Sequence, residues 1–128
     1  MAFRHSITTD AAPRPVGPYA QGVVVGNTLF VSGQIGIESS TNRLVGGGIV
    51  PETEQVLENV LAIVHAAGFS RADVVKTTVY LTDLADFRSV NEVYGRYFTE
   101  SHPARATVQV AALPGGARVE IEAVAVRG

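Results

Sequence analysis

The sequence predicts one α+β domain, residues 1–128, with an antiparallel or mixed β-sheet and two helices on one of its faces. Three observations predict this class. A chain of 128 residues has the usual length of one domain and can bury a sizeable core. Alternating and β-branched segments and helically spaced segments follow one another in the order β-β-α-β-α-β-β. No internal repeat divides this order into smaller units.

The first two strands are predicted to form a hairpin. Gly22–Val25 and Thr28–Ser32 are rich in apolar and β-branched residues. The dipeptide Gly26-Asn27 between them tolerates positive φ at both positions, as a two-residue hairpin turn requires. An additional short strand at Phe3–Ile7 is left open.

A surface loop is predicted over residues 36–50, which are rich in Gly, Ser, Thr and Asn. Its three glycines, Gly46–Gly48, have no following Lys-Ser/Thr pair and no GxGxxG spacing. They therefore indicate a flexible loop rather than a phosphate-binding loop.

A first helix is predicted from about Pro51 to just before Gly68. Proline suits a first helical position, and Glu52 and Glu54 suit the positive end of the helix dipole. An apolar stripe with helical spacing should face the sheet: Leu57, Val60, Leu61, Val64 and Ala67.

A strand and a second helix follow. Val74–Leu81 alternates in the manner of a strand, and Asp86 is placed to cap the next helix. Gly95 within that helix costs about 1 kcal/mol relative to alanine. The apolar residues of the helix are Phe87, Val90, Tyr94, Tyr97 and Phe98. The last three are predicted to be core rather than a stacking platform.

The last two strands, Arg105–Ala112 and Arg118–Val126, are predicted to pair as an antiparallel hairpin across a loop at 113–116. The final strand is apolar at both odd and even positions, so both faces of the sheet should be covered. Helices cover one face, and the other is the predicted subunit interface.

In this hairpin, four polar side chains share one face of the sheet: Arg105, Thr107, Glu120 and Glu122. Arg105 and Glu120 are then four residues apart along the strands, roughly 13 Å, which leaves room for a small ligand. Two interpretations remain open. Arg105 forms a structural ion pair or caps a strand end, or its planar fork binds the carboxylate of a small 2-imino or 2-keto acid.

The composition limits the partners and the chemistry that are expected for this chain. A net charge of −2 and a pI near 5.9 disfavour nucleic acid and anionic membranes as partners. An apolar content of 46% favours burial of some surface in an oligomer. The absence of cysteine excludes thiolate chemistry and indicates the cytoplasm, and no apolar leader or spanning run is present. His5, His65 and His102 lack metal-ligand spacing, so no metal is expected.

Six segments form a recognisable series over nearly the whole chain: GPYAQG (17–22), LFVSGQIG (29–36), ENVLAIVHAAG (58–68), VVKTTVYLTDLADFRSVNEVY (74–94), PARATVQVAALP (103–114) and VEIEAVAV (119–126). Together they resemble the RidA family of reactive-intermediate deaminases. The PAR strand followed by a strand with alternate glutamates is the most specific part of this resemblance.

The resemblance implies a chorismate-mutase-like α+β fold, a homotrimer with a central β-barrel, and ligand sites in the clefts between subunits. It also implies hydrolysis of 2-aminoacrylate, 2-aminocrotonate and their imine tautomers (2-iminopropanoate and 2-iminobutanoate) to 2-oxo acids and ammonia. Pyridoxal-phosphate dehydratases would supply these substrates without forming a stable complex. The reaction requires no cofactor.

The resemblance also assigns site residues. Arg105 matches the arginine that binds the substrate carboxylate, and Glu120 matches the glutamate associated with the attacking water. The matching cleft residues are Tyr19, Ser32, Gly33, Asn91 and Thr107. Thr107 stands where many members have cysteine.

Three departures from the family pattern remain: a short loop at Thr99–His102, Glu52 in place of a common glutamine, and the glycines at 46–48. Glu52 has no expected role beyond the helix dipole. Two alternative functions are open. One is a non-catalytic trimer that binds a 2-keto acid or a partner. The other, a ribonuclease or translation inhibitor, is disfavoured by the acidic charge balance.

Overall fold

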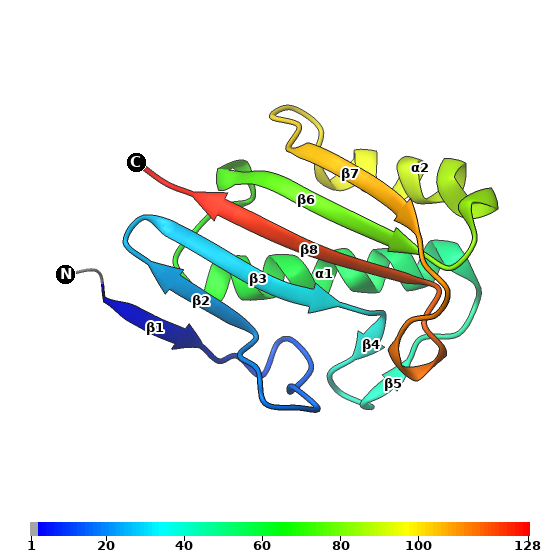
Figure 1. The fold of residues 1–128 in the computed structure, drawn as a ribbon, viewed down its shortest axis with the longest axis horizontal. Helices are drawn as coiled ribbons and strands as arrows, with labels where there is room; N and C mark the ends of the chain where they lie inside the picture. The colour runs from blue at the N-terminus through cyan, green and yellow to red at the C-terminus, as the bar shows by residue number, and fades with distance from the viewer. Residues whose placement is uncertain (1–2) are drawn as a thin grey trace.

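The computed structural model describes residues 3–128 and contains a six-stranded sheet, a two-stranded sheet and two α-helices (Figure 1). The large sheet has the order β1-β2-β3-β8-β6-β7. Its strands are β1 (Arg4–Ile7), β2 (Gly22–Val25), β3 (Thr28–Gln34), β6 (Val74–Leu81), β7 (Ala104–Gln109) and β8 (Val119–Val126). The helices are α1 (Ile49–Ala66) and α2 (Phe87–Tyr97), and the short 3₁₀ turns are η1 (Arg71–Asp73), η2 (Leu84–Asp86) and η3 (Pro114–Gly116).

Both helices pack on the same face of the sheet, as Figure 1 shows. The sheet is mixed, because β6 and β7 are parallel whereas the other neighbours are antiparallel. The predicted α+β class with two helices on one face is therefore confirmed.

The core lies between α1 and the central strands. The predicted α1 stripe is buried apart from Ala67, which is partly buried. It packs against β8 and β3, and the buried residues of β6 belong to the same core cluster. The largest fully buried side chains include Phe98, Leu29, Leu57, Ile63, Leu81 and Ile121. Removal of this apolar surface from water is the main term that stabilises the domain.

Most local predictions are confirmed, with small shifts. The β2–β3 hairpin turns at Gly26-Asn27, and the N-terminal strand left open is β1. Helix α1 begins at Ile49, two residues before Pro51. The predicted loop at 36–50 contains a small hairpin, β4 (Ile37–Glu38) and β5 (Arg43–Leu44). Its glycines Gly47 and Gly48 have φ values of 102° and 97°, which suit a chain reversal before the helix.

Asp86 occupies the N-cap position of α2 as predicted, but its side chain makes no cap bond. Instead its carboxylate lies 3.4 Å from the guanidinium of Arg118. The preceding Asp83 side chain accepts the N–H of Ala85 and so supports η2. The N-terminal end of α2 is therefore tied to the start of β8.

The predicted pairing of the last two strands is wrong. Strand β7 pairs in parallel with β6, with Arg105 opposite Thr77, and β8 lies between β3 and β6. The physical reason is that β6, α2 and β7 form a crossover unit, in which a helix returns the chain to a parallel neighbouring position. Residues 110–118, including η3, then carry the chain past β6 to the centre of the sheet.

The face of the sheet away from the helices carries exposed apolar side chains. Phe30 on β3 is 51% exposed, and Val108 on β7 and Val126 on β8 are also exposed. These side chains share that face, since Phe30 pairs with Val124 and Val108 pairs with Tyr80. We call it the open face. Within residues 3–128, no helix has both the length and the apolarity needed to cross a lipid bilayer.

Candidate functional site

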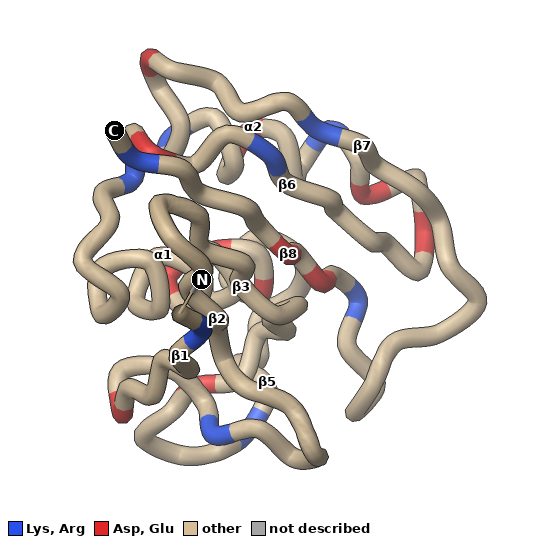
Figure 2. The backbone as a smooth tube through the Cα atoms, turned by 60° about the vertical axis from the view of Figure 1, so that its left-hand side comes forward, with Lys and Arg blue, Asp and Glu red and all other residues tan. Residues whose placement is uncertain are grey.

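The two charged residues singled out by the sequence lie on opposite faces of the sheet. Arg105 shares the helix face with Thr77 and Ala123, whereas Glu120 pairs with Tyr80 on the open face. The prediction that they share a face is therefore wrong, because it relied on a β7–β8 register that does not exist. Figure 2 shows that the basic position on β7 and the acidic positions on β8 also lie on different strands, with β6 between them.

Arg105 lies on the edge strand β7 and reaches toward α2. Its Nη2 donates a hydrogen bond of 2.7 Å to Oδ1 of Asn91. Its Cζ lies 4.7 Å from the ring centroid of Tyr94 and 5.6 Å from that of Phe87. Among residues 3–128 no carboxylate forms an ion pair with this guanidinium. The structural ion pair considered for Arg105 is therefore not formed within the described part of the chain.

The surroundings of Arg105 hold the guanidinium in place without neutralising it. Each cation–π contact contributes about 0.5–2 kcal/mol, and the Asn91 bond uses one of five N–H donors. The remaining donors are available to a carboxylate. An arginine held in this way is prepared for bidentate binding of a planar anion.

Tyr94 has two roles, of which the sequence predicted one. It is buried as predicted, with its hydroxyl 2.7 Å from Oγ1 of Thr77, and its ring also supports Arg105. Burial raises the pKa of the Tyr94 phenol, although Thr77 and Arg105 oppose the shift. Phe87, Asn91 and Tyr94 are four and three residues apart, so they share one face of α2. This spacing could have predicted that they support a common side chain, which is Arg105.

Thr107 lies two residues from Arg105 on the same face of β7. Its Oγ1 is buried and has no hydrogen-bond partner within the described chain. A buried hydroxyl without a partner is uncommon, since desolvation of a polar group costs free energy. Thr107 therefore offers a free donor or acceptor beside the guanidinium.

Glu120 lines a hollow of about 180 Å³ on the other side of the sheet. Tyr19 and Gly33, both predicted site residues, line the same hollow. Other lining residues are Pro13, Ile35, Ile37 and Pro114. We call this cavity the Glu120 hollow. The structure thus divides the predicted residues into two groups, with Arg105, Asn91 and Thr107 on one side and Tyr19, Gly33 and Glu120 on the other.

Gly33 lies directly beneath the Glu120 carboxylate. An added Cβ at this position would lie 2.9 Å from Cδ of Glu120 and would clash with Oε2. The neighbouring Ser32 donates a 2.5 Å hydrogen bond to the carbonyl of Ala20. This bond links β3 to Ala20, the residue after Tyr19, and it uses the Ser32 hydroxyl as its donor.

The environment of Glu120 disfavours its charged form. Burial, and then the nearby carboxylate of Glu122, raise the pKa of Glu120 above its usual value. The folded protein therefore holds the Glu120 proton more tightly than the unfolded chain does. This contribution favours folding at low pH and is lost as pH rises through the raised pKa.

Replacement of Glu120 by glutamine is expected to raise the melting temperature at about pH 7.5, because the amide removes an unfavourably placed negative charge. The gain should disappear near pH 3.5, where the carboxyl is protonated in both folded and unfolded chains. Thermal unfolding of both proteins across this pH range measures the effect.

The exposed Glu100, changed to glutamine, serves as the control for the loss of one negative charge. An equal rise for Glu100→Gln, or a gain for Glu120→Gln that persists at low pH, would contradict the assigned cause. The expected pattern is a gain specific to Glu120 and to pH values above its pKa.

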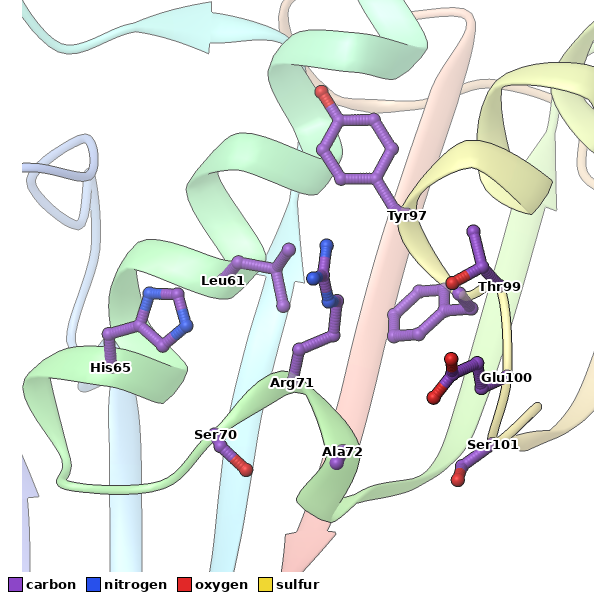
Figure 3. Close-up of a pocket in the computed structure, with 10 residues that line it drawn as sticks. Leu61, His65, Ser70, Arg71, Ala72, Tyr97, Thr99, Glu100 and Ser101 are labelled. Carbon is purple, nitrogen blue, oxygen red and sulfur yellow. The ribbon is translucent and has the colours of Figure 1, made fainter.

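A separate hollow of about 550 Å³ lies on the helix side, and Figure 3 shows its walls from α1, η1 and the segment after α2. Its charged side chains, Arg71 and Glu100, are exposed, and it contains none of the predicted site residues. Despite its greater volume we do not assign the candidate site to it. Within residues 3–128, no group of three His, Cys, Asp or Glu side chains is arranged to hold a metal ion.

Comparisons with known proteins extend over nearly the full chain. The family model described as Endoribonuclease L-PSP matches residues 9–127. A human protein named 2-iminobutanoate/2-iminopropanoate deaminase is 52% identical over 126 residues, which cover 98% of this chain and 92% of the human one.

Solved structures are also similar to this chain over nearly its full length. RidA from an Antarctic Psychrobacter species has a TM-score of 0.93 and 51% identity, covering 96% of this chain and 99% of that one. TdcF from E. coli, solved with bound serine, has a TM-score of 0.93 and 46% identity, covering 97% of this chain and 99% of that one.

Proposed function

This chain belongs to the endoribonuclease L-PSP family, the family of the RidA proteins, and we propose that it hydrolyses small 2-imine acids and their enamine tautomers to 2-oxo acids and ammonia. The substrates are 2-iminopropanoate and 2-iminobutanoate, with 2-aminoacrylate and 2-aminocrotonate as their enamine forms. The observation that carries the proposal is the 52% identity, over 98% of this chain, to a protein named for that activity.

In the proposed assembly three copies form a homotrimer with a central β-barrel, and each active site lies in a cleft between two subunits. Two observations support this. Arg105 and Glu120 point away from opposite faces of one sheet, so a second copy is needed to bring an arginine and a glutamate together. The open face also carries exposed Phe30, Val108 and Val126, whose contact with a neighbouring copy would remove apolar surface from water.

Each charged residue has one role in the proposed mechanism. Arg105 of one subunit binds the substrate carboxylate through the planar fork that Asn91 and Tyr94 hold in place. Glu120 of the next subunit orients a water molecule and accepts its proton as the water adds to the C=N carbon. The raised pKa of Glu120 makes it a stronger base, closer to the working pH.

The remaining steps balance without an oxidant or reductant. Water adds across C=N to give a carbinolamine, and the proton that Glu120 accepted passes to the nitrogen. The hydroxyl then loses its proton as C=O forms and ammonia leaves. No metal, redox cofactor or covalent nucleophile is needed for this sequence. Imines already hydrolyse in water, so positioning of substrate and water supplies the modest acceleration required.

The other site residues complete the cleft. Thr107 supplies its unpaired hydroxyl beside Arg105, and Tyr19 and Gly33 form the wall and floor beneath Glu120. Ser32 fixes the Tyr19 segment through Ala20. The substrates come from pyridoxal-phosphate dehydratases, with no stable complex, and the proposed location is the cytoplasm.

A coupled assay tests the function. A serine or threonine dehydratase generates the imine in the presence and absence of this protein, and the rates of imine loss and 2-oxo acid formation are recorded. Equal rates with and without the protein would end the enzyme proposal. Binding of 2-oxobutanoate without faster imine loss would indicate a non-catalytic binding protein instead.

An RNA substrate provides the second arm of this test. The acidic balance of 12 Asp and Glu against 10 Lys and Arg does not favour binding to a polyanion. RNA cleavage that increases with protein concentration and survives further purification would support a ribonuclease. We expect none.

Replacement of Gly33 by alanine is expected to lower kcat by about tenfold or more, because the new methyl group displaces the Glu120 carboxylate. The displaced group is the end of a flexible side chain, so the melting temperature should change little. Steady-state kinetics and thermal unfolding measure the two effects. Gly95→Ala is the control, since a Cβ there meets no atom within 4 Å, and equal kcat losses would refute the explanation.

A further inference from the structure

Three of the buried polar side chains that lie outside the proposed chemistry contact the backbone near different walls of the Glu120 hollow. Gln21 is 3% exposed, Glu52 is 5% exposed and Asn59 is fully buried. Burial of a polar group is unfavourable unless hydrogen bonds replace its contacts with water. The hydrogen-bond partners of these side chains therefore indicate the structural role of each side chain.

The Gln21 side chain holds residues 9–13, which precede Tyr19 in the chain. Its Nε2 donates to the carbonyls of Ala12 and Pro13 at 3.2 and 2.9 Å. The same side chain bonds Thr9 twice, accepting from its N–H at 2.8 Å and donating to its carbonyl at 3.0 Å. Because residues 8–20 contain no helix or strand, this one amide satisfies backbone groups that no ladder would satisfy. Pro13 is a wall of the hollow.

Asn59 holds the opposite wall. Its Nδ2 donates to the carbonyls of Ile35 and Ile37 at 3.0 and 2.8 Å, and both residues line the hollow. Its Oδ1 accepts a 2.8 Å hydrogen bond from Gln55, one helical turn earlier on α1. The wall formed by residues 35–37 is thus attached to a rigid helix.

Glu52 holds the strand that carries Glu120. Its Oε2 accepts a 2.6 Å hydrogen bond from the backbone N–H of Arg118, two residues before Glu120. Gly36 allows this approach, since a Cβ there would lie 2.7 Å from Cγ of Glu52. Helix α1 is therefore linked to the start of β8 through one carboxylate oxygen.

We propose that Gln21, Glu52 and Asn59 are positioning residues that set the shape of the Glu120 hollow and, through it, the location of the Glu120 carboxylate. Two of the three come from α1, which makes that helix the common support for β8 and the 35–37 wall. The inference rests on the proposed function only for its kinetic consequences. The geometry of the hollow is a separate property and has a separate readout.

The test compares variants of similar volume: Gln21→Met, Glu52→Met and Asn59→Leu remove the polar contacts. Thr53→Val is the matched control, because Thr53 is also buried on α1 but bonds only to Ile49 within the helix. Glu52→Gln tests rescue, because its amide oxygen can still accept from Arg118. Each protein is examined for kcat, KM, melting temperature and the pKa of Glu120, obtained by ¹³C-carboxyl NMR with Glu120→Gln for assignment.

We expect each of the three variants to lower kcat by about tenfold or more, with a smaller change in KM, and to shift the Glu120 titration. Thr53→Val should lose stability but keep both kcat and the titration, and Glu52→Gln should resemble the unmodified protein. Folded variants with unchanged kcat and unchanged Glu120 titration would overturn the proposal.

If Glu52→Met does not fold, Glu52→Asp shortens the side chain by one methylene while keeping its charge, and the same loss of kcat and shifted titration are expected. If the unmodified protein does not hydrolyse imines, the proposed function fails, and the Glu120 titration alone still decides whether these residues position the carboxylate.

Discussion

Replacement of Arg105 by lysine is expected to lower kcat/KM for 2-iminopropanoate and 2-iminobutanoate by about tenfold to hundredfold, because one charge-assisted hydrogen bond contributes about 1.5–3 kcal/mol. Lysine keeps the positive charge but lacks the planar fork that binds two carboxylate oxygens at once. It also loses the 2.7 Å bond to Asn91 and the stacking on Tyr94. Initial rates over a range of substrate concentrations measure the loss.

The control for Arg105→Lys is Arg71→Lys, which makes the same chemical change at an exposed arginine on the helix side. We expect Arg71→Lys to leave kcat/KM unchanged. The melting temperature of Arg105→Lys should fall modestly, because the Asn91 bond and the Tyr94 contact are lost at a residue that is only partly buried on the edge strand β7. Full activity in Arg105→Lys would mean that the charge alone, or another residue, binds the carboxylate.

The local elements could be predicted because their signals are local. The turn dipeptide Gly26-Asn27 specifies the β2–β3 hairpin, and the helical stripe of α1 specifies which side is buried. Strand pairing is different, because it depends on contacts between distant segments. The neighbouring strands β7 and β8 favoured a hairpin from the sequence, whereas the crossover through α2 places β7 beside β6.

One sequence feature pointed to the observed topology. The final strand is apolar at both odd and even positions, and such a strand is favoured in the centre of a sheet. A central strand needs two neighbours, and only one of them can be the strand directly before it in the chain. The pattern of Val119–Val126 predicts that both faces are covered, and it also argues against an edge position.

The candidate site could be predicted by residue type but not by arrangement. Arg105 and Glu120 stand out by residue type, but the faces predicted for them followed from the wrong register. The buried contacts of Gln21, Glu52 and Asn59 are not predicted by the sequence pattern, since polar residues are usually at the surface. Their burial depends on backbone groups far away in the sequence, such as the N–H of Arg118 for Glu52.

A mixture of two inactive variants is expected to recover activity. Arg105→Ala retains Glu120, and Glu120→Gln retains Arg105, so in the proposed trimer a cleft between the two different subunits would contain both groups. In a ring of three copies with head-to-tail sites, each mixed trimer contains one intact site, and random assembly at equal amounts yields about a quarter of all sites intact. The two proteins are unfolded together, refolded, and assayed for imine hydrolysis against each variant treated alone.

This result depends on the faces that the two side chains occupy. Arg105 and Glu120 lie on opposite faces of one sheet, so one chain cannot bring them around a three- or four-carbon acid. A site between copies overcomes this because the open face of one subunit can meet the β7 edge of the next. If the refolded mixture stays as inactive as its parents, while the unmodified protein regains full activity by the same procedure, each site is built from a single chain. Glu120 would then lose its role as the base that acts with Arg105.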